Sequence, residues 1–257
     1  MGNVGLLLVG AVLFVNGLSS LGLVPARSAA PLNLFVGGAQ VVLPTLILVQ
    51  SGGDPAVIAA TWPSYLFGFT YLWFGLQIVF GLEPQGFGWY SAFVAGIAAY
   101  HAVINAGNDP VFAVIWATWA IMWSLFFVLL GLGRTRVGTF DLGRFTGWFL
   151  VLLGIPTCTV SALFLIDGRW STDAVAGLGA LAALAAATVL SITLTRLGRP
   201  GPLGEAGGSA RPAEAAASAK AAGGASAPVA EAQAAQAAPT TPDAVAGART
   251  EGELAGV

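Results

Sequence analysis

The stretch FAVIWATWAIMWSLFF, residues 112–127, contains three tryptophans and no charged residue. It lies in a longer charge-free window, 110–133, and a helix needs roughly 20 apolar residues to cross the hydrocarbon core of a bilayer. The composition of all 257 residues agrees, because 56% are hydrophobic and only 9% are charged, too few to cover a water-soluble globule. The stretch therefore predicts one membrane-spanning helix of an all-α polytopic membrane protein.

Charge-free windows of similar length recur along the chain as far as Arg196. They predict seven spans, at about 2–22, 31–50, 62–81, 88–107, 111–132, 146–166 and 174–195. The windows are continuously apolar, whereas the strands of a membrane barrel would alternate, so a barrel is excluded. The first window has no basic segment before it, and we expect a retained helix instead of a cleaved signal peptide.

The distribution of arginine predicts how the chain is oriented in the membrane. Six arginines follow odd-numbered spans: Arg27, Arg134, Arg136, Arg144, Arg196 and Arg199. Only Arg169 follows an even-numbered span. Because basic loops stay in the cytoplasm, the N-terminus is predicted outside and the C-terminus inside. Six spans would leave Arg196 and Arg199 outside, which is why the alanine-rich window at 174–195 is predicted to be a seventh span.

The remaining residues give no indication of a catalytic or metal site. From residue 198 onward it is rich in Ala, Gly, Pro, Ser and Glu without any aromatic residue, which predicts a disordered cytoplasmic tail. The single Cys158 cannot form an internal disulfide, and the single His101 cannot build a metal cluster. We expect no cofactor, no metal and no nucleic-acid partner, and we expect His101 to be a hydrogen-bonded structural residue.

The tryptophans of the opening stretch share one face of its helix. Successive residues are 100° apart, so Trp116, Trp119 and Trp123 fall within about 60° of one another, with Phe112 and Phe127 on the same stripe. Tryptophan usually gathers at the membrane interfaces, but Trp119 lies near the middle of its span and still needs an acceptor for its indole N–H. The stripe predicts either a packed contact with other helices or the wall of a slot for a small planar molecule.

Other polar groups at membrane depth are uncharged. The stretch YLFGFTYLWFG, residues 65–75, places Phe67, Tyr71 and Phe74 on one helix face, and Thr70 and Tyr71 add hydroxyls. Amides occur within the spans at Asn16, Asn33, Gln40, Gln77 and Asn105. Such groups tend to face a bundle interior or a water-filled path. Apart from residues at the rims, no Asp, Glu, Lys or Arg lies within a span, so the inventory favours a neutral substrate.

Six segments together carry a resemblance to a known family. They are GLLLVGAVLFVNGL (5–18), SAAPLNLFVGGAQVV (28–42), LFGFTYLWFGL (66–76), GWYSAFVA (88–95), FAVIWATWAIMW (112–123) and LGRFTGWFL (142–150). In this order they resemble the AmiS/UreI family of bacterial urea channels and short-chain amide transporters. The resemblance implies a six-helix channel bundle in each protomer, a homohexamer, and passage of urea or short-chain aliphatic amides.

The resemblance also implies which residues line the pathway. The family's pore-lining positions fall on Leu6, Val9, Leu13, Phe67, Tyr71, Trp116, Trp119 and Trp123. One position departs from the pattern, because Leu153 stands where the family usually has a glutamate. The acid-gated members use histidines in outer loops, which this chain lacks, so we expect a channel that is not acid-gated.

The domains expected from these arguments are a six-helix channel domain at 1–167, an additional transmembrane helix at 168–197 and the disordered tail at 198–257. The expected function is a passive channel in the bacterial inner membrane, surrounded by lipid, with a cytosolic amidase or urease that consumes the permeant. Two alternatives stay open: an ion-coupled secondary transporter of a small neutral solute, and a non-transporting structural or interaction protein. No catalytic residues are expected, because Ser19, Ser124 and Ser161 have no identifiable base.

Overall fold

Helices account for almost all of residues 2–198, the part of the chain that this computed structural model describes. The α-helices are α1 (Gly2–Ser20), α2 (Ala26–Gln50), α3 (Pro55–Thr61), α4 (Pro63–Phe80), α5 (Gln85–Asn105), α6 (Pro110–Phe126), α7 (Leu142–Gly154), α8 (Ser161–Ile166) and α9 (Ala174–Leu197). Two π-helical turns, η1 (Phe127–Gly131) and η2 (Ile155–Val160), extend α6 and α7. The predicted tail from residue 199 onward lies outside the described residues.

All seven predicted spans are helical, which confirms the fold class. The fifth span consists of α6 and η1, and the sixth of α7, η2 and α8. The second span begins at Ala26, earlier than the predicted residue 31, and the third is preceded by the short helix α3. The alanine-rich seventh span forms a continuous helix, α9, of 24 residues.

Six helical segments among residues 2–198 are long and apolar enough to cross a membrane. They are Gly2–Ser20, Ala26–Gln50, Gln85–Asn105, Pro110–Gly131, Leu142–Ile166 and Ala174–Leu197. The remaining long helix, α4, has 18 residues and contains tyrosine, tryptophan and glutamine, which lower its mean hydropathy.

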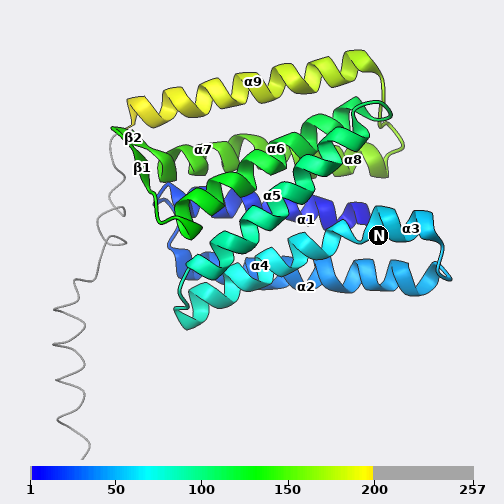
Figure 1. Cartoon of the computed structure of the whole chain (residues 1–257), viewed down its shortest axis with the longest axis horizontal. Coiled ribbons are helices and arrows are strands. Elements are labelled where there is room, and N and C mark those ends of the chain that lie inside the picture. The colour runs from blue at the N-terminus through cyan, green and yellow to red at the C-terminus, as the bar shows by residue number, and fades with distance from the viewer. Residues whose placement is uncertain (1, 199–257) are drawn as a thin grey trace, which may run out of the picture. The chain divides into compact units, whose positions relative to one another are not determined.

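The long helices lie side by side and alternate in direction, as Figure 1 shows. The main packing pairs are α2 with α4, α5 with α6, and α1 with α7. Helix α9 packs on α6 and α7 at the outside of the bundle. Only 11% of its apolar window is buried, against 39% for α6 and η1. Because the crossings alternate, residues 2 and 198 lie at opposite ends of the bundle (Figure 1).

Aspartate side chains cap the starts of three helices. Asp54 and Asp109 each precede a proline at the first helical position, and their side chains accept hydrogen bonds from the backbone N–H of Ala56 (2.8 Å) and Phe112 (2.9 Å). Proline suits this position because its missing N–H would have no partner within the helix. Asp141 caps α7, which begins with leucine, and its side chain accepts a hydrogen bond from the backbone N–H of Arg144 at 2.9 Å. The two Asp-Pro dipeptides therefore end the loops and start α3 and α6.

Proline also explains the π-helical turn in the middle of the sixth span. Pro156 lacks the N–H that would bond one turn back, so the helix widens over η2 before α8 resumes. Ser161 Oγ donates to the carbonyl oxygen of Pro156 at 3.0 Å, and Thr159 Oγ1 donates to the carbonyl of Leu7 in α1 at 3.1 Å. The Ser161 hydroxyl thus bonds a carbonyl of the irregular turn, and the Thr159 hydroxyl finds its acceptor in α1.

The loop between η1 and α7 forms a short hairpin of β1 (Arg136–Val137) and β2 (Phe140–Asp141). The strands are antiparallel, with Arg136 opposite Asp141 and Val137 opposite Phe140. Gly138 provides the positive φ of 60° at the turn. The hairpin contacts the start of α7 and the end of α9.

Candidate functional site

Aromatic rings from α4 and α6 meet in the centre of the bundle. The ring of Phe67 lies between those of three tryptophans, with centroid distances of 5.8 Å to Trp116, 5.1 Å to Trp119 and 6.1 Å to Trp123. Tyr71 lies one turn further along α4, 6.4 Å from Trp123. All five side chains are buried. The tryptophan stripe predicted from the sequence therefore faces the interior, where its partners are the aromatic residues of α4.

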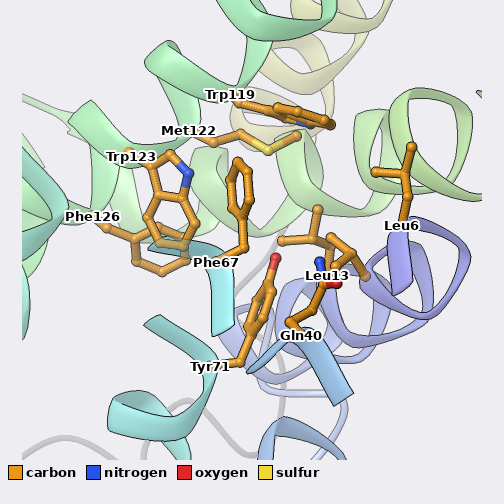
Figure 2. Close-up of a pocket in the computed structure, with 10 residues that line it drawn as sticks. Leu6, Leu13, Gln40, Phe67, Tyr71, Trp119, Met122, Trp123 and Phe126 are labelled. Carbon is orange, nitrogen blue, oxygen red and sulfur yellow. The ribbon is translucent and has the colours of Figure 1, made fainter. Parts of the chain in front are cut away.

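These rings enclose a cavity of about 20 Å³. It is lined by Leu6, Val9, Leu13, Gln40, Phe67, Tyr71, Trp119, Met122, Trp123 and Phe126 (Figure 2). Seven of the eight residues predicted to line a pathway are in this set, and the eighth, Trp116, contacts Phe67 and Trp119 from beside it. The cavity has room for about one water molecule.

Two polar side chains point into this apolar space. Figure 2 shows the Tyr71 hydroxyl and the Gln40 amide directed toward the middle of the lining residues. The Gln40 amide also lies directly over Gly5 of α1, where any Cβ would collide with its oxygen. Of the described residues that line the cavity, none is charged. The site therefore offers a few hydrogen-bonding groups in front of flat rings.

A second cavity, of about 10 Å³, continues from the first. It is lined by Leu13, Asn16, Thr70, Tyr71, Phe74, Phe87, Trp123 and Phe126, half of which also line the first cavity. Asn16 borders it as one of a buried pair with Asn33, in which each amide donates to the oxygen of the other at 2.9 and 2.8 Å. The two cavities form a narrow, interrupted space between α1, α4 and α6, to which α2 adds Gln40 and α5 adds Phe87.

The indole N–H of Trp119 has the acceptor that its position at membrane depth requires. It donates to Thr157 Oγ1 at 3.2 Å, and that hydroxyl donates to the backbone carbonyl of Leu153 at 2.6 Å. Trp119 itself is only 5% exposed. The widened turn η2 thus holds the central tryptophan of the stripe through a hydroxyl.

Leu153 does not reach the aromatic cavity. Its side chain is 3% exposed and, together with Thr157, lines a separate and mainly apolar groove between α6, α7 and α9. The position where the resemblance implies a glutamate is therefore occupied by an apolar side chain packed among three helices.

The expectation for His101 is wrong for one of its ring nitrogens. Nε2 is buried and has no hydrogen-bond partner within the described residues. The ring is instead held by aromatic neighbours, because it stacks on Trp116 at 4.5 Å and lies 5.6 Å from Trp62. His101 accordingly packs against the back of the tryptophan stripe. Among residues 2–198, no three His, Cys, Asp or Glu side chains come together as they would around a metal ion.

The two ends of the predicted stripe do not line the cavity. Phe127 begins η1 and packs on Trp89 at 4.9 Å, while Phe112 packs on Trp170 at 4.9 Å. Phe126 takes the place expected of Phe127, because seven residues after Trp119 is almost two full helical turns. The same reasoning could have found Phe126 from the sequence.

Gln40 and Met122 are the other lining residues that the sequence prediction of the pathway left out. The sequence pointed to Gln40, because it is an amide within a predicted span. The sequence did not point to Met122, because methionine is common in the apolar core of a protein.

Comparison with known proteins places this geometry among transporters. A model of the AmiS/UreI family of transporters matches residues 1–169. A protein of Rhodococcus erythropolis named as a transporter, AmiS2, is 52% identical over 181 residues, which cover 70% of this chain and 85% of that protein. An acid-activated urea channel of Helicobacter pylori is 29% identical over 195 residues, covering 64% of this chain and 97% of that channel.

A solved structure shares the fold. The cryo-EM structure of the Helicobacter pylori urea channel in its closed state is similar with a TM-score of 0.59 and 30% identity, covering 66% of this chain and 100% of that one. The family model ends at residue 169, so α9 lies beyond the matched region.

Proposed function

The chain belongs to the AmiS/UreI family of transporters, and from this membership we propose that it is a passive channel for urea or short-chain aliphatic amides. Its relatives include a protein named as a urea channel and another named as a transporter. The observation that carries the proposal is the uncharged cavity between Phe67, Trp119 and Trp123, into which the Tyr71 hydroxyl and the Gln40 amide point.

This cavity suits small, flat and neutral solutes. Urea and acetamide are planar, with polar edges that can meet a hydroxyl or an amide and faces that can lie on an aromatic ring. A few such polar groups replace part of the water that the solute loses on entry. Binding stays weak, which conduction requires. The small volume means that the rings around Phe67 must separate for a solute to pass.

The uncharged lining of the aromatic cavity favours passive movement of the solute over movement coupled to an ion gradient. Ion-coupled transporters usually place charged groups at membrane depth, and of the described residues around the cavity none is charged. We infer that flux follows the solute gradient alone and does not respond to an imposed proton or sodium gradient. A dependence on either gradient would favour the ion-coupled alternative.

Flux into proteoliposomes, followed by stopped-flow light scattering, tests the proposal. We expect rapid entry of urea and acetamide, and we expect Trp119→Ala to increase the entry of bulkier amides relative to urea, because it removes a ring from the wall. Trp89→Ala is the matched control, since Trp89 is 59% exposed and packs on Phe127 away from the cavity. Equal effects of the two substitutions would show that the cavity is not the path. Absence of flux for either solute would favour a structural protein.

The orientation is proposed from the arginines together with the alternating helices. Arg27, the hairpin with Arg136, and Arg196 lie at one end of the bundle, and the loop with Arg169 lies at the other. We propose that the first end faces the cytoplasm of a bacterial inner membrane. Cysteines introduced at Ser51 and Thr139 test this assignment, because a membrane-impermeant maleimide should label only the former in intact cells.

The remaining proposals concern organisation. We propose a channel body at 1–167 and an added helix at 168–197, supported by the end of the family match at residue 169. We also propose a homohexamer, which apolar side chains exposed on α2 and α5, such as Phe35 and Phe93, would help to form. Its mass in native nanodiscs would measure the number of protomers. A cytosolic amidase or urease would consume the permeant, since passive entry is useful where the solute is removed.

A further inference from the structure

Thr157 contacts the wall of the aromatic cavity from behind. It is not among the residues that line the aromatic cavity, and its side chain instead lines the groove between α6, α7 and α9. It reaches the wall through Trp119, whose indole N–H donates to Thr157 Oγ1 at 3.2 Å. From this place, Thr157 acts on a solute in the aromatic cavity through the position of that ring.

The Thr157 hydroxyl is oriented to accept the hydrogen bond from the indole. Oγ1 donates its single proton to the backbone carbonyl of Leu153 at 2.6 Å, so a lone pair is left to accept from Trp119. Both side chains are buried at membrane depth, with 8% of Thr157 and 5% of Trp119 exposed. Lipid offers no replacement for a lost partner, so this hydrogen bond favours one position of the indole ring over all others.

The far side of Thr157 is not filled by packed side chains. On the cavity side, the Trp119 ring meets Phe67 at 5.1 Å and Trp116 at 4.9 Å, both edge to face. On the other side, Thr157 borders a groove of about 430 Å³, to which α9 contributes mostly glycine and alanine. Close packing on both sides would hold a ring by itself, but here one side is open. The hydrogen bond therefore has a large share in keeping Trp119 beside Phe67.

We propose that Thr157 is a specificity-determining residue, which excludes bulkier amides by holding Trp119 in the wall of the aromatic cavity. The inference rests on the proposed passage of urea or short-chain amides through that cavity. Selectivity in a narrow pore depends on its diameter. The rings must separate for any solute to pass, and a ring that Thr157 holds separates less than one that is free to tilt. Thr157 is thus a positioning residue that sets the largest solute able to pass.

The rates at which urea and isobutyramide enter proteoliposomes test the proposal through their ratio. Thr157→Val keeps the shape of the side chain and removes the hydroxyl. We expect it to raise the rate of isobutyramide relative to urea by roughly two- to tenfold, the size of one net hydrogen bond. Thr157→Ser keeps a hydroxyl and should preserve the wild-type ratio. The matched control is Thr118→Val, because Thr118 is also buried in the same groove but donates to the carbonyl of Val114 in its own helix at 2.8 Å.

Trp119→Phe separates the hydrogen bond from any other effect of Thr157. It removes the indole N–H and keeps an aromatic ring, so adding Thr157→Val to it should change the ratio no further. The hydrogen bond is also measured without transport, from the indole N–H signals of the eight tryptophans in NMR spectra of nitrogen-15-labelled protein in micelles. The signal that disappears in Trp119→Phe should lie at the shift of a hydrogen-bonded indole in wild type and move upfield in Thr157→Val.

Three outcomes would overturn the proposal while the channel function stands: a wild-type ratio in Thr157→Val, an equal rise in Thr118→Val, or an undiminished effect of Thr157→Val when Trp119→Phe is also present. A wild-type Trp119 signal at the shift of a free indole would overturn it even if Thr157→Val did not fold. Absence of flux of both solutes through the wild-type protein would instead contradict the proposed function, and this inference with it.

Discussion

At the residue scale, some polar side chains within the bundle bond to protein partners, and others point into the aromatic cavity. Asn16 and Asn33 bond each other, and Trp119 bonds Thr157. Tyr71 and Gln40 instead point into the cavity. Polar groups at membrane depth need a partner in the protein or in a bound solute, so these two groups are available to a permeant.

Tyr71→Phe removes the hydroxyl while keeping the ring. We expect urea flux in proteoliposomes to fall by roughly two- to tenfold, the size of one net hydrogen bond, with little change in stability. The matched control is Tyr65→Phe, because the Tyr65 hydroxyl shares a hydrogen bond with exposed Thr45 at 2.8 Å outside the cavity. An unchanged flux in Tyr71→Phe, or an equal loss in Tyr65→Phe, would contradict the role of this hydroxyl.

The sequence could predict much of the site at this scale. The helical spacing of Trp116, Trp119 and Trp123 indicates a shared face, and the need of a buried indole for an acceptor predicts a partner such as Thr157. It could not predict the unpartnered nitrogen of His101, because stacking on Trp116 depends on how α5 meets α6. Whether solutes move along the residues that line the cavity stays a prediction for flux to test.

At the element scale, close contacts between glycines set the distance between α1 and α7. A Cβ added at Gly17 would lie 2.7 Å from Cγ2 of Val151 and 2.8 Å from the carbonyl oxygen of Gly147. A Cβ at Gly147 would in turn lie 3.1 Å from the carbonyl oxygen of Gly17. Small residues allow membrane helices to approach closely and gain van der Waals contact. This contact fixes α1, which contributes Leu6, Val9 and Leu13 to the lining of the cavity.

Gly17→Ala should therefore destabilise the bundle. We expect a loss of about 1–3 kcal/mol, typical of overpacking, in unfolding by sodium dodecyl sulfate in mixed micelles. Gly38→Ala serves as the control, since nothing lies within 4 Å of a Cβ at Gly38 in α2. Alanine there should be neutral or stabilising, because it favours helix. Equal stability of both variants would show that the close contact does not limit packing.

The number of helical spans was predictable because the cost of charge in lipid leaves long charge-free windows. The irregular turns were harder to foresee. Pro156 signals a break, but the widened turn that follows depends on hydroxyl bonds such as that from Thr159 to Leu7.

At the scale of the whole molecule, the bundle holds its single histidine between aromatic rings near the end of α5. His101 packs between Trp62 and Trp116, and histidine is the side chain whose charge ordinarily changes between pH 5 and 8. An acid sensor in an outer loop is therefore not expected from this sequence, in which histidine occurs once.

We accordingly predict that urea flux changes less than about twofold between pH 7 and pH 5, since the lining carries no group that titrates in that interval. Proteoliposomes with equal internal and external pH provide the measurement. Strong stimulation at pH 5 would refute a channel that is open without acid. Comparison with His101→Gln would then show whether protonation behind Trp116 is responsible.

In the proposed seven-span topology, the seventh helix changes the side of the membrane on which the described residues finish. Residues 2 and 198 lie at opposite ends of the bundle, so α9 finishes at the end opposite residue 2. A chain that stopped at residue 169 would expose both ends to the same compartment. The aromatic cavity is lined from α1, α2, α4 and α6, none of which would have to change. In this topology, gain or loss of α9 would therefore move a C-terminal segment to the other side of the membrane without changing the helices that line the aromatic cavity.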